Sequence, residues 1–174
     1  MAPSGRGQRR FDRRPTKPDI AGGRRIVYRH PSRASKAVGA SMQNLVTVFG
    51  GSGFIGAQAV RRLAKAGWRI RVAVRNPNLA YRMRLLGDVG QIDLVQANIR
   101  NRPSIARALD GAVAAVNLVG VLHERGRQGF QAIHVMGARN VAELAREQGV
   151  ARLVQMSALG ADAGSAAKYA RSKA

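Results

Sequence analysis

The sequence of 174 residues contains no cysteine, few aromatic residues and few carboxylates. The lack of cysteine excludes disulfides and thiolate metal sites. No apolar run approaches the roughly 20 residues that a membrane-spanning helix needs, and the first residues hold no apolar signal-peptide core. One neighbouring pair of possible ligands, His123 and Glu124, is too small a set to bind a metal. We therefore expect a soluble, cytoplasmic protein without a metal site.

The scarcity of acidic residues leaves a net charge of +21, because 30 Lys and Arg face only nine Asp and Glu. Such an excess can indicate a nucleic-acid partner or another anionic surface. The basic residues are scattered along the chain rather than grouped into one run. We expect no specific nucleic-acid binding, and a basic nucleic-acid-binding protein stays as a remote alternative.

Length and composition indicate about one domain, preceded by a segment of different character. Residues 1–41 hold 11 Lys or Arg with scattered proline and glycine, and they show no sustained hydrophobic period. Such a segment buries too little apolar surface to offset its ordering entropy. It can be a disordered basic arm, a transit peptide, or an over-extended start with Met42 as the true initiator. We favour the last interpretation and expect the folded domain to span residues 42–174.

From Met42 onward, apolar runs alternate with amphipathic segments. Predicted strands span residues 45–49, 69–75, 92–97, 113–119 and 150–156. Predicted helices span residues 54–66, 79–86, 103–109 and 130–148, and another begins at residue 166. In the first helix, Ile55, Ala59, Leu63 and Ala66 are expected to form the buried face. This alternation predicts a parallel α/β sheet with helices on both faces.

The stretch Leu45–Gly56 (LVTVFGGSGFIG) joins the first strand to the first helix. Gly50, Gly53 and Gly56 have the spacing G-x-x-G-x-x-G, which predicts a tight turn whose backbone N–H groups and helix dipole face a phosphate. No Gly-Lys-Ser/Thr follows, so the turn is not a P-loop. Together with the alternating elements, it predicts a doubly wound Rossmann sheet of order 3-2-1-4-5, with the ligand at the carboxyl ends of the strands.

Arg75 ends the second predicted strand, and no Asp or Glu lies between Gly56 and Arg75. In this fold a carboxylate at that place binds the ribose hydroxyls of NAD, whereas an arginine accommodates the 2′-phosphate of NADP. The sequence therefore predicts a preference for NADP(H) over NAD(H). The alternative is an ordinary solvated arginine at a strand end.

Two further strand ends carry candidate cofactor contacts. Asn98 and Ile99 follow the third predicted strand, where an adenine ring would lie, although Asn98 can also be a simple turn residue. Leu118, Val119 and Gly120 end the fourth strand at the centre of the sheet. A glycine there allows the backbone to approach the cofactor closely.

Tyr169 and Lys173 are spaced i, i+4, so a helix places both on one face. An ammonium close to a phenol favours the phenolate, which suits a general acid or base. The Lys173 ammonium can also bind the nicotinamide ribose. Ser157 follows the fifth predicted strand, where its hydroxyl could hold a substrate carbonyl. We therefore predict Ser157, Tyr169 and Lys173 as catalytic candidates.

These motifs together resemble the short-chain dehydrogenase/reductase superfamily in its extended or atypical branch. The resemblance rests on GGSGFIG at residues 50–56, on Ser157, on Tyr169 with Lys173, and on HVMGARNV at residues 134–141. That last stretch matches the family pattern N-V-x-G-T-x-N-V, with His134 and Ala138 as departures. We expect His134 itself to be a partly buried histidine with satisfied hydrogen bonds. VNLVGVL followed by GFQAIHVMGARNVA is also similar to bacterial relatives of the dinucleotide-binding accessory subunit of respiratory complex I.

The resemblance implies a bound dinucleotide, held by the glycine turn and its neighbours. The residues it implies at the cofactor, together with those predicted above, are Gly50, Ser52, Gly53, Phe54, Ile55, Gly56, Arg75, Asn98, Ile99, Leu118, Val119, Gly120 and Lys173. In the complex I branch the resemblance implies a structural nucleotide, contact with complex I subunits, and a place at the inner membrane surface, in the mitochondrial matrix for a eukaryotic protein. The alternative is a catalytic NADP-dependent reductase, epimerase or dehydratase.

Family members continue beyond the helix that carries the Tyr and Lys, with further strands and a smaller substrate region. The chain ends at Ala174, inside that predicted helix. We therefore expect an incomplete Rossmann domain that lacks its later strands and its substrate region.

Overall fold

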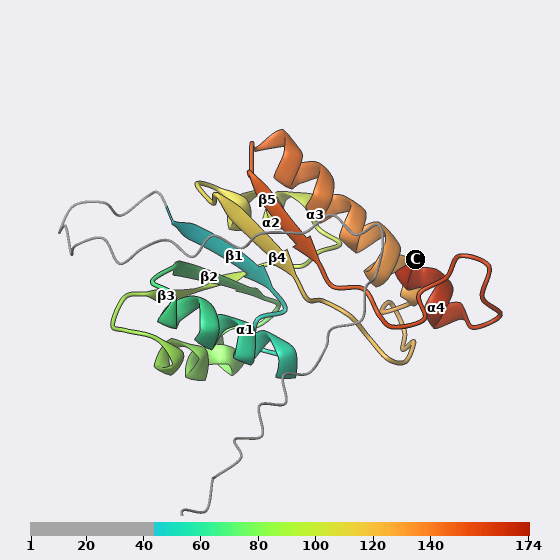
Figure 1. Cartoon of the computed structure of the whole chain (residues 1–174), viewed down its shortest axis with the longest axis horizontal. Helices are drawn as coiled ribbons and strands as arrows, with labels where there is room; N and C mark the ends of the chain where they lie inside the picture. The colour runs from blue at the N-terminus through green and yellow to red at the C-terminus, as the bar shows by residue number, and fades with distance from the viewer. Residues whose placement is uncertain (1–43) are drawn as a thin grey trace, which may run out of the picture. The chain divides into compact units, whose positions relative to one another are not determined.

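The computed structural model describes residues 44–174. The expectations for residues 1–41 and for Met42 as initiator lie outside this part. The strands of the described residues form one parallel sheet of five strands in the order β3-β2-β1-β4-β5 (Figure 1). This confirms the predicted α/β fold class and its strand order. No helix among residues 44–174 combines the length and the apolar character needed to cross a membrane.

Strands and helices alternate along the described chain, and η marks a 3₁₀ or a π helix. The elements are β1 (Leu45–Phe49), α1 (Phe54–Lys65), β2 (Arg69–Val74), the 3₁₀ helix η1 (Pro77–Leu86), β3 (Ile92–Gln96), α2 (Arg102–Leu109), β4 (Ala114–Asn117), the π helix η2 (Gln131–Val135), α3 (Met136–Glu147), β5 (Arg152–Gln155) and α4 (Lys168–Lys173).

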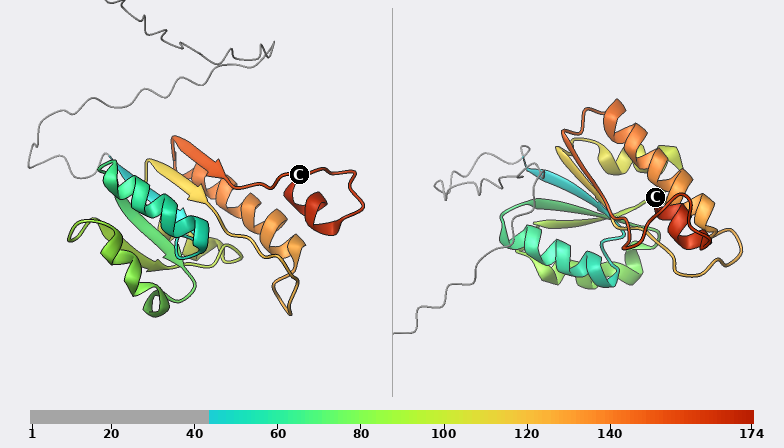
Figure 2. Two further views of the ribbon diagram at one scale, coloured as in Figure 1. Left: turned by 60° about the horizontal axis from the view of Figure 1, so that its bottom comes forward. Right: turned by 45° about the vertical axis from the view of Figure 1, so that its right-hand side comes forward.

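The sheet lies between two helical layers (Figure 2). Helices α1 and η1 cover one face, where Val60, Ala64 and Met83 pack against the buried valines of β1 and β2. Helices α2 and α3 cover the other face, where Ile105 and Val141 are fully buried. Each fully buried Val or Ile contributes about 1.5–3 kcal/mol to stability relative to an exposed one. These two cores therefore hold the strand ends, and hence the site, in place.

The buried face of α1 differs from the predicted one. Gly56, Val60 and Ala64 are buried, whereas Ile55 is 52% exposed. The buried face of α1 is thus displaced by one residue from the predicted face of Ile55, Ala59, Leu63 and Ala66. The cause is the glycine turn: Gly56 must face the Gly50–Gly51 backbone, and this contact sets the rotation of the whole helix.

The helix predicted at residues 79–86 is a 3₁₀ helix that begins earlier, at Pro77. Proline at the first helical position needs no N–H partner, and the Asn76 Oδ1 atom accepts the Asn78 N–H at 3.1 Å. A 3₁₀ helix has three residues per turn, so one side of η1 buries Ala80 and Met83 together.

Strands β4 and β5 are shorter than predicted, and the helix predicted at residues 130–148 begins with the π turn η2. Strand β4 ends at Asn117. The Asn117 Oδ1 atom accepts the Val119 N–H at 3.2 Å, so this N–H is bonded to a side chain and not to a neighbouring strand. Asn117 is buried, and its Nδ2 donates to Gln155 Oε1 at 2.8 Å, which ties the ends of β4 and β5 together.

Candidate functional site

The turn after β1 is built from backbone that leaves no room for side chains. Gly50 adopts a φ of +75°, and its N–H donates to the Ala73 carbonyl at 3.2 Å. A Cβ atom at Gly56 would lie 2.6 Å from the carbonyl oxygen of Gly51, and closer still to that of Gly50. The turn and the first turn of α1 are therefore in direct backbone contact, as a phosphate cradle requires.

The N-terminus of α1 has neither a side-chain cap nor a nearby negative charge from its own first turn. Gly53 is the N-cap and makes no side-chain cap, and no acidic residue lies in the first turn of the helix. The positive end of the helix dipole is consequently not neutralised from within the helix, and it favours an anion. Phe54 is 89% exposed and Ile55 is half exposed, so neither side chain is buried at this end of the helix.

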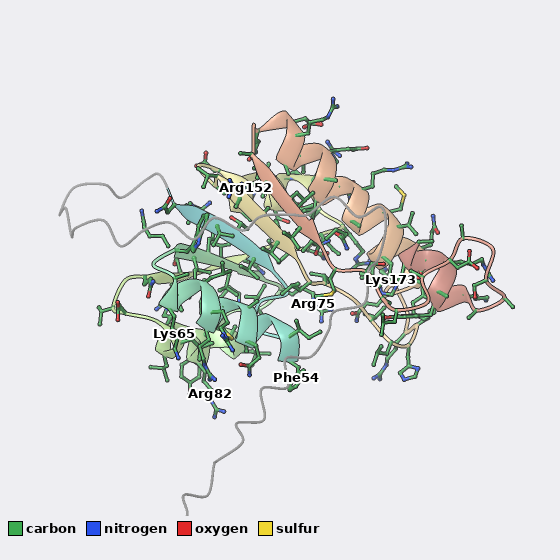
Figure 3. The ribbon with its side chains drawn as sticks, viewed as in Figure 1. Phe54, Lys65, Arg75, Arg82, Arg152 and Lys173 are labelled. Atoms are coloured by element: carbon green, nitrogen blue, oxygen red, sulfur yellow. The ribbon has the colours of Figure 1, made fainter. Side chains whose placement is uncertain are left out.

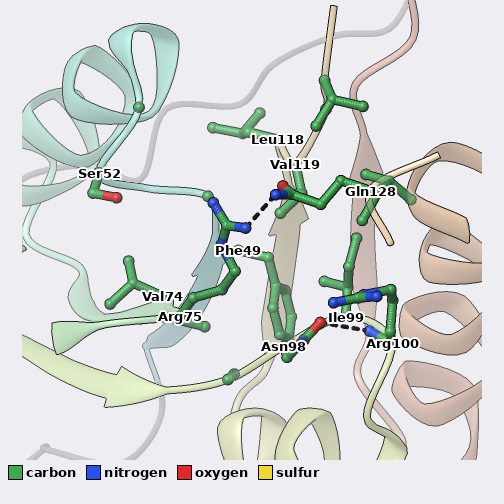
Figure 4. A pocket seen from close by; sticks show the side chains of 17 residues that line it. Phe49, Ser52, Val74, Arg75, Asn98, Ile99, Arg100, Leu118, Val119 and Gln128 are labelled. Carbon is green, nitrogen blue, oxygen red and sulfur yellow. Dashed lines mark hydrogen bonds between the residues drawn. The ribbon is translucent and has the colours of Figure 1, made fainter. Parts of the chain in front are cut away.

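A pocket of about 260 Å³ opens beside the turn, at the carboxyl ends of the strands (Figure 4). Loops after β1, β2, β3 and β4 all contribute to it. The lining consists of Phe49, Gly50, Ser52, Gly53, Ala73, Val74, Arg75, Ala97, Asn98, Ile99, Arg100, Leu118, Val119, Gly120, Val121, Gln128 and Ile133. Nine of the predicted cofactor residues belong to this lining of the described chain. Phe54, Ile55, Gly56 and Lys173 do not.

Every charged residue of this described lining is an arginine. The Arg75 Nη1 donates to Gln128 Oε1 at 2.8 Å, so the guanidinium is held across the pocket by the loop after β4 (Figure 4). The Arg100 Nη1 donates to the carbonyl of Arg127 at 2.9 Å. Two guanidiniums without a competing carboxylate in the described lining make the pocket suited to a phosphate.

The turn after β3 shapes the neighbouring wall. Asn98 Oδ1 accepts the Arg100 N–H at 3.1 Å, and the Asn98 N–H donates to Ser104 Oγ at 3.0 Å. Ile99 is 5% exposed and belongs to the core below the pocket. Asn98 therefore does act as a turn residue here, while it also lines the pocket.

The predicted catalytic residues gather at α4, beside the pocket rather than in its lining. The Ser157 Oγ donates to the backbone carbonyl of Lys173 at 2.7 Å, and the Lys173 Nζ donates to the Met156 carbonyl at 3.4 Å. Burial lowers the pKa of the Lys173 ammonium below its ordinary value. A Cβ atom at Gly120 would lie 3.3 Å from that ammonium, so Gly120 brings α4 close to the pocket edge. Tyr169 packs edge-on against Phe130 and His134, with ring centroids 5.6 and 5.5 Å away.

His134 connects α4 to the loop after β4. Its Nε2 accepts the Val121 N–H at 3.0 Å, and its Nδ1 lies 2.8 Å from Ser172 Oγ. Because the Ser172 hydroxyl donates its proton to the Tyr169 carbonyl at 2.7 Å, Nδ1 must be the donor. The imidazole is therefore neutral, which agrees with a pKa lowered by burial and by the Lys173 charge. The prediction of a satisfied, buried histidine is confirmed.

Sequence reasoning missed Gln128 and Ser172. Gln128 stands in the loop that follows β4, and the sequence gives no signal that this loop reaches back to Arg75. Ser172 lies between Tyr169 and Lys173, and its role follows only from the packing of α4 against His134. The departure of His134 from the family pattern is the one sequence signal that pointed to this contact.

A family model described as NAD(P)H-binding matches residues 50–173. The chain is 33% identical over 131 residues to the mitochondrial NADH dehydrogenase (ubiquinone) 1 alpha subcomplex subunit 9 of Rattus norvegicus, covering 75% of this chain and 35% of that protein. It is 34% identical over 131 residues to a ceramide reductase of Caulobacter vibrioides, covering 75% of this chain and 40% of that protein. The chain thus spans well under half of these curated relatives.

Solved structures share the fold. Pen from Bacillus thuringiensis has a TM-score of 0.66 at 19% identity, over 75% of this chain and 42% of that one. Uronate dehydrogenase from Agrobacterium tumefaciens, in complex with NAD, has a TM-score of 0.55 at 23% identity, over 68% of this chain and 42% of that one. The sheet order, the glycine turn and the family match together lead to one assignment. The chain belongs to the NAD(P)H-binding family, as a Rossmann domain that resembles the mitochondrial NADH dehydrogenase subunit.

Proposed function

We propose that the pocket binds NADP(H) in preference to NAD(H), with Arg75 as the ligand of the 2′-phosphate. The observation that carries this proposal is the charge of the described lining, which contains Arg75 and Arg100 and no carboxylate. A carboxylate at the end of β2 would repel the extra phosphate, whereas a guanidinium binds it through paired hydrogen bonds. Gln128 supports the preference because it holds the Arg75 side chain over the pocket.

The residues of the cradle fit a dinucleotide. The Gly50 turn and the N-terminus of α1 suit the pyrophosphate, since no acidic residue of the first helical turn opposes an anion there. A Cβ atom at Gly50 would lie only 3.1 Å from the Val119 backbone nitrogen. Asn98 and Ile99 line the wall after β3 and suit the adenine. Leu118, Val119 and Gly120 line the wall after β4 and suit the nicotinamide half, with Lys173 beyond Gly120 at its ribose.

The preference is tested by titrating NADPH and NADH into the purified full chain and into the Arg75→Asp variant. We expect the native chain to favour NADPH, and the variant to lose at least about tenfold in NADPH affinity because one charged hydrogen-bonded contact is lost. Arg82→Asp is the matched control, since Arg82 is an exposed arginine on η1, outside the pocket (Figure 3). An unchanged NADPH to NADH ratio in Arg75→Asp would remove Arg75 from the site.

We propose further that the nucleotide is structural in the protein to which this domain belongs. The similarity to NADH dehydrogenase subunits supports this, as does the Ser157 hydroxyl, which is already engaged with the Lys173 backbone. Consistent partners are complex I subunits at the membrane surface, on the cytoplasmic side of a bacterial membrane or in the mitochondrial matrix. Tight NADPH binding without turnover, and co-purification of the whole protein with the membrane complex, are the expected results.

A catalytic reductase is the second candidate, and the proximity of the Lys173 ammonium to Gly120 is the observation that favours it. When bound, the dinucleotide would supply or accept a hydride. Tyr169 would hold the proton at the substrate oxygen, Lys173 would orient the ribose, and Ser157 would bind the same oxygen after leaving its backbone partner. Steady NADPH oxidation with a carbonyl or quinone substrate, abolished in Tyr169→Phe, would favour this candidate over the structural one.

A further inference from the structure

A basic and apolar surface lies on the α1/η1 layer, outside the pocket. Its members are exposed side chains of α1, of η1 and of the loop that follows η1. We call it the α1/η1 surface; it consists of Arg61, Lys65, Leu79, Tyr81, Arg82, Arg84, Leu85 and Val89. Lys65 and Arg82 project from this layer in Figure 3. None of these residues lines the nucleotide pocket, so the pocket does not explain them.

The 3₁₀ geometry of η1 explains how large apolar side chains come to face solvent. With three residues per turn, positions three apart lie above one another. Ala80 and Met83 form the buried line, whereas Leu79, Arg82 and Leu85 form an outward line. Leu79 and Leu85 are 83% and 80% exposed, and one arginine stands between them. Tyr81, 61% exposed, and Arg84 form a second solvent-facing line.

Helix α1 extends this surface. Arg61 and Lys65 are one helical turn apart, so they lie on the same side of α1. Lys65 and Leu85 line one shallow groove between the ends of α1 and η1, together with the carboxylate-bearing Asp88. The basic residues of α1 are thus continuous with the apolar line of η1. Val89, fully exposed, stands beside Asp88 at the tip of the following loop.

The charge of this layer contrasts with that of the opposite one. Helices α1 and η1 contain five Lys or Arg and no carboxylate, and Asp88 follows η1. On the α2/α3 layer, by contrast, the Arg102 guanidinium is paired with Glu143 and Glu147 at 2.6 and 3.0 Å. The basic charge of the α1/η1 layer is therefore largely uncompensated within its own surface, and it complements an anionic partner.

We propose that the α1/η1 surface docks on an anionic lipid bilayer. Arginine and lysine are attracted to acidic headgroups, and leucine, valine and tyrosine side chains lie favourably at the boundary between headgroups and acyl chains. Nucleic acid fits less well, because exposed leucines offer neither a base-stacking face nor a hydrogen bond. The surface turns one helical layer of the domain toward the membrane and leaves the carboxyl ends of the strands free to bind nucleotide.

Co-sedimentation of the full chain with vesicles tests the proposal, using phosphatidylcholine with and without phosphatidylglycerol. We expect binding to the acidic vesicles only. The double variant Arg82→Gln with Arg84→Gln should bind about thirty-fold more weakly, because each basic residue near the surface contributes about a factor of five. Leu79→Ser with Leu85→Ser should also weaken binding, by at least about tenfold, since it removes the inserted apolar groups without changing charge.

Each variant has a matched control elsewhere on the described chain. Arg139→Gln with Arg146→Gln removes two exposed arginines from α3, and Leu122→Ser with Leu159→Ser removes two exposed leucines from loops. Both controls should bind vesicles like the native chain. Equal losses in controls and surface variants would overturn the proposal. Binding to duplex DNA is measured on the same variants. The proposal would also be overturned if the leucine variant bound vesicles normally and the arginine variant lost affinity for DNA. NADPH affinity, measured on the same samples, reports on the pocket separately and verifies folding.

Discussion

The two halves of the candidate site are held in the protein by different means. The glycine turn belongs to the sheet: Val48, Phe49 and Val72 beside it are at most 1% exposed, and its contacts are backbone contacts. Helix α4, which carries Tyr169 and Lys173, contains no buried residue among its six. The cradle is thus part of the fold's core, whereas the candidate catalytic half rests on the outside of it.

Helix α4 is joined to the rest of the domain by the packing of the Tyr169 ring and by a few polar contacts of side chains. His134 contacts Ser172, Ser157 contacts the Lys173 carbonyl, and the Lys173 ammonium contacts the Met156 carbonyl. Segments with few buried apolar contacts open at lower free energy than core strands. We therefore expect nucleotide binding to tolerate changes in α4, and expect α4 to respond to changes that leave the cradle intact.

The largest effect should come from breaking the cradle. Gly56→Ala places a Cβ atom against the carbonyls of Gly50 and Gly51, so either the turn or α1 must shift. We expect a loss of about 3 kcal/mol in the free energy of unfolding, as for other overpacked sites. Denaturant unfolding measures it. Alanine at Gly53 is the control, because its Cβ atom would approach Gly50 no closer than 3.4 Å at an ordinary φ of −76°. Equal losses at both positions would mean that crowding is not the cause.

An intermediate effect should come from His134, which links the two halves. His134→Phe leaves the Val121 N–H without its acceptor and Ser172 without its donor, at a cost of about 2 kcal/mol. Hydrogen exchange should then accelerate at residues 168–173 more than in β1. Ser172→Ala keeps the contact between His134 and Val121, and it removes the bonds of the Ser172 hydroxyl to His134 and to the Tyr169 carbonyl. Its effect should be confined to residues 168–173. If β1 and α4 lose protection from exchange to the same degree, α4 does not open separately. The glycine turn and α4 would then not differ in local stability.

The smallest effect should be that of pH on the same contact. The pKa of His134 is lowered by burial and by the charge of Lys173, so the unfolded chain takes up a proton before the folded one does. Stability should therefore fall as the pH drops below about 6.5, the ordinary value for histidine. Unfolding curves between about pH 7 and pH 5, above the range of ordinary carboxylates, isolate this contribution. The slope should be shallower in His134→Phe, and an identical slope would assign it to another group.

The sequence predicted the cradle better than it predicted α4. The spacing of Gly50, Gly53 and Gly56 constrains the backbone directly, and the apolar runs before and after it define a buried parallel sheet. Strand order follows from the right-handed connections of such a sheet. Both ends of β1 were accordingly predicted to the residue.

Other features depended on tertiary contacts that the sequence does not display. The rotation of α1 is set by Gly56 against the turn, whereas hydrophobic periodicity alone favoured Ile55. The 3₁₀ form of η1 and the π turn at the start of the long helix differ from an α-helix only in hydrogen-bond register. The contact of Gln128 with Arg75 joins residues 53 positions apart, through a loop without a motif.

A phosphate cradle made of main-chain atoms has a consequence for how such a domain diversifies. Backbone N–H groups are the same whatever the side chains, so amino-acid substitutions at most positions leave the cradle unchanged. The condition is that Gly50 and Gly56 stay without side chains. Under the proposed NADP(H) preference, coenzyme choice depends by contrast on two side chains, the exposed Arg75 after β2 and its partner Gln128. Replacing these two side chains would let the domain exchange one coenzyme for another without rebuilding any strand or helix.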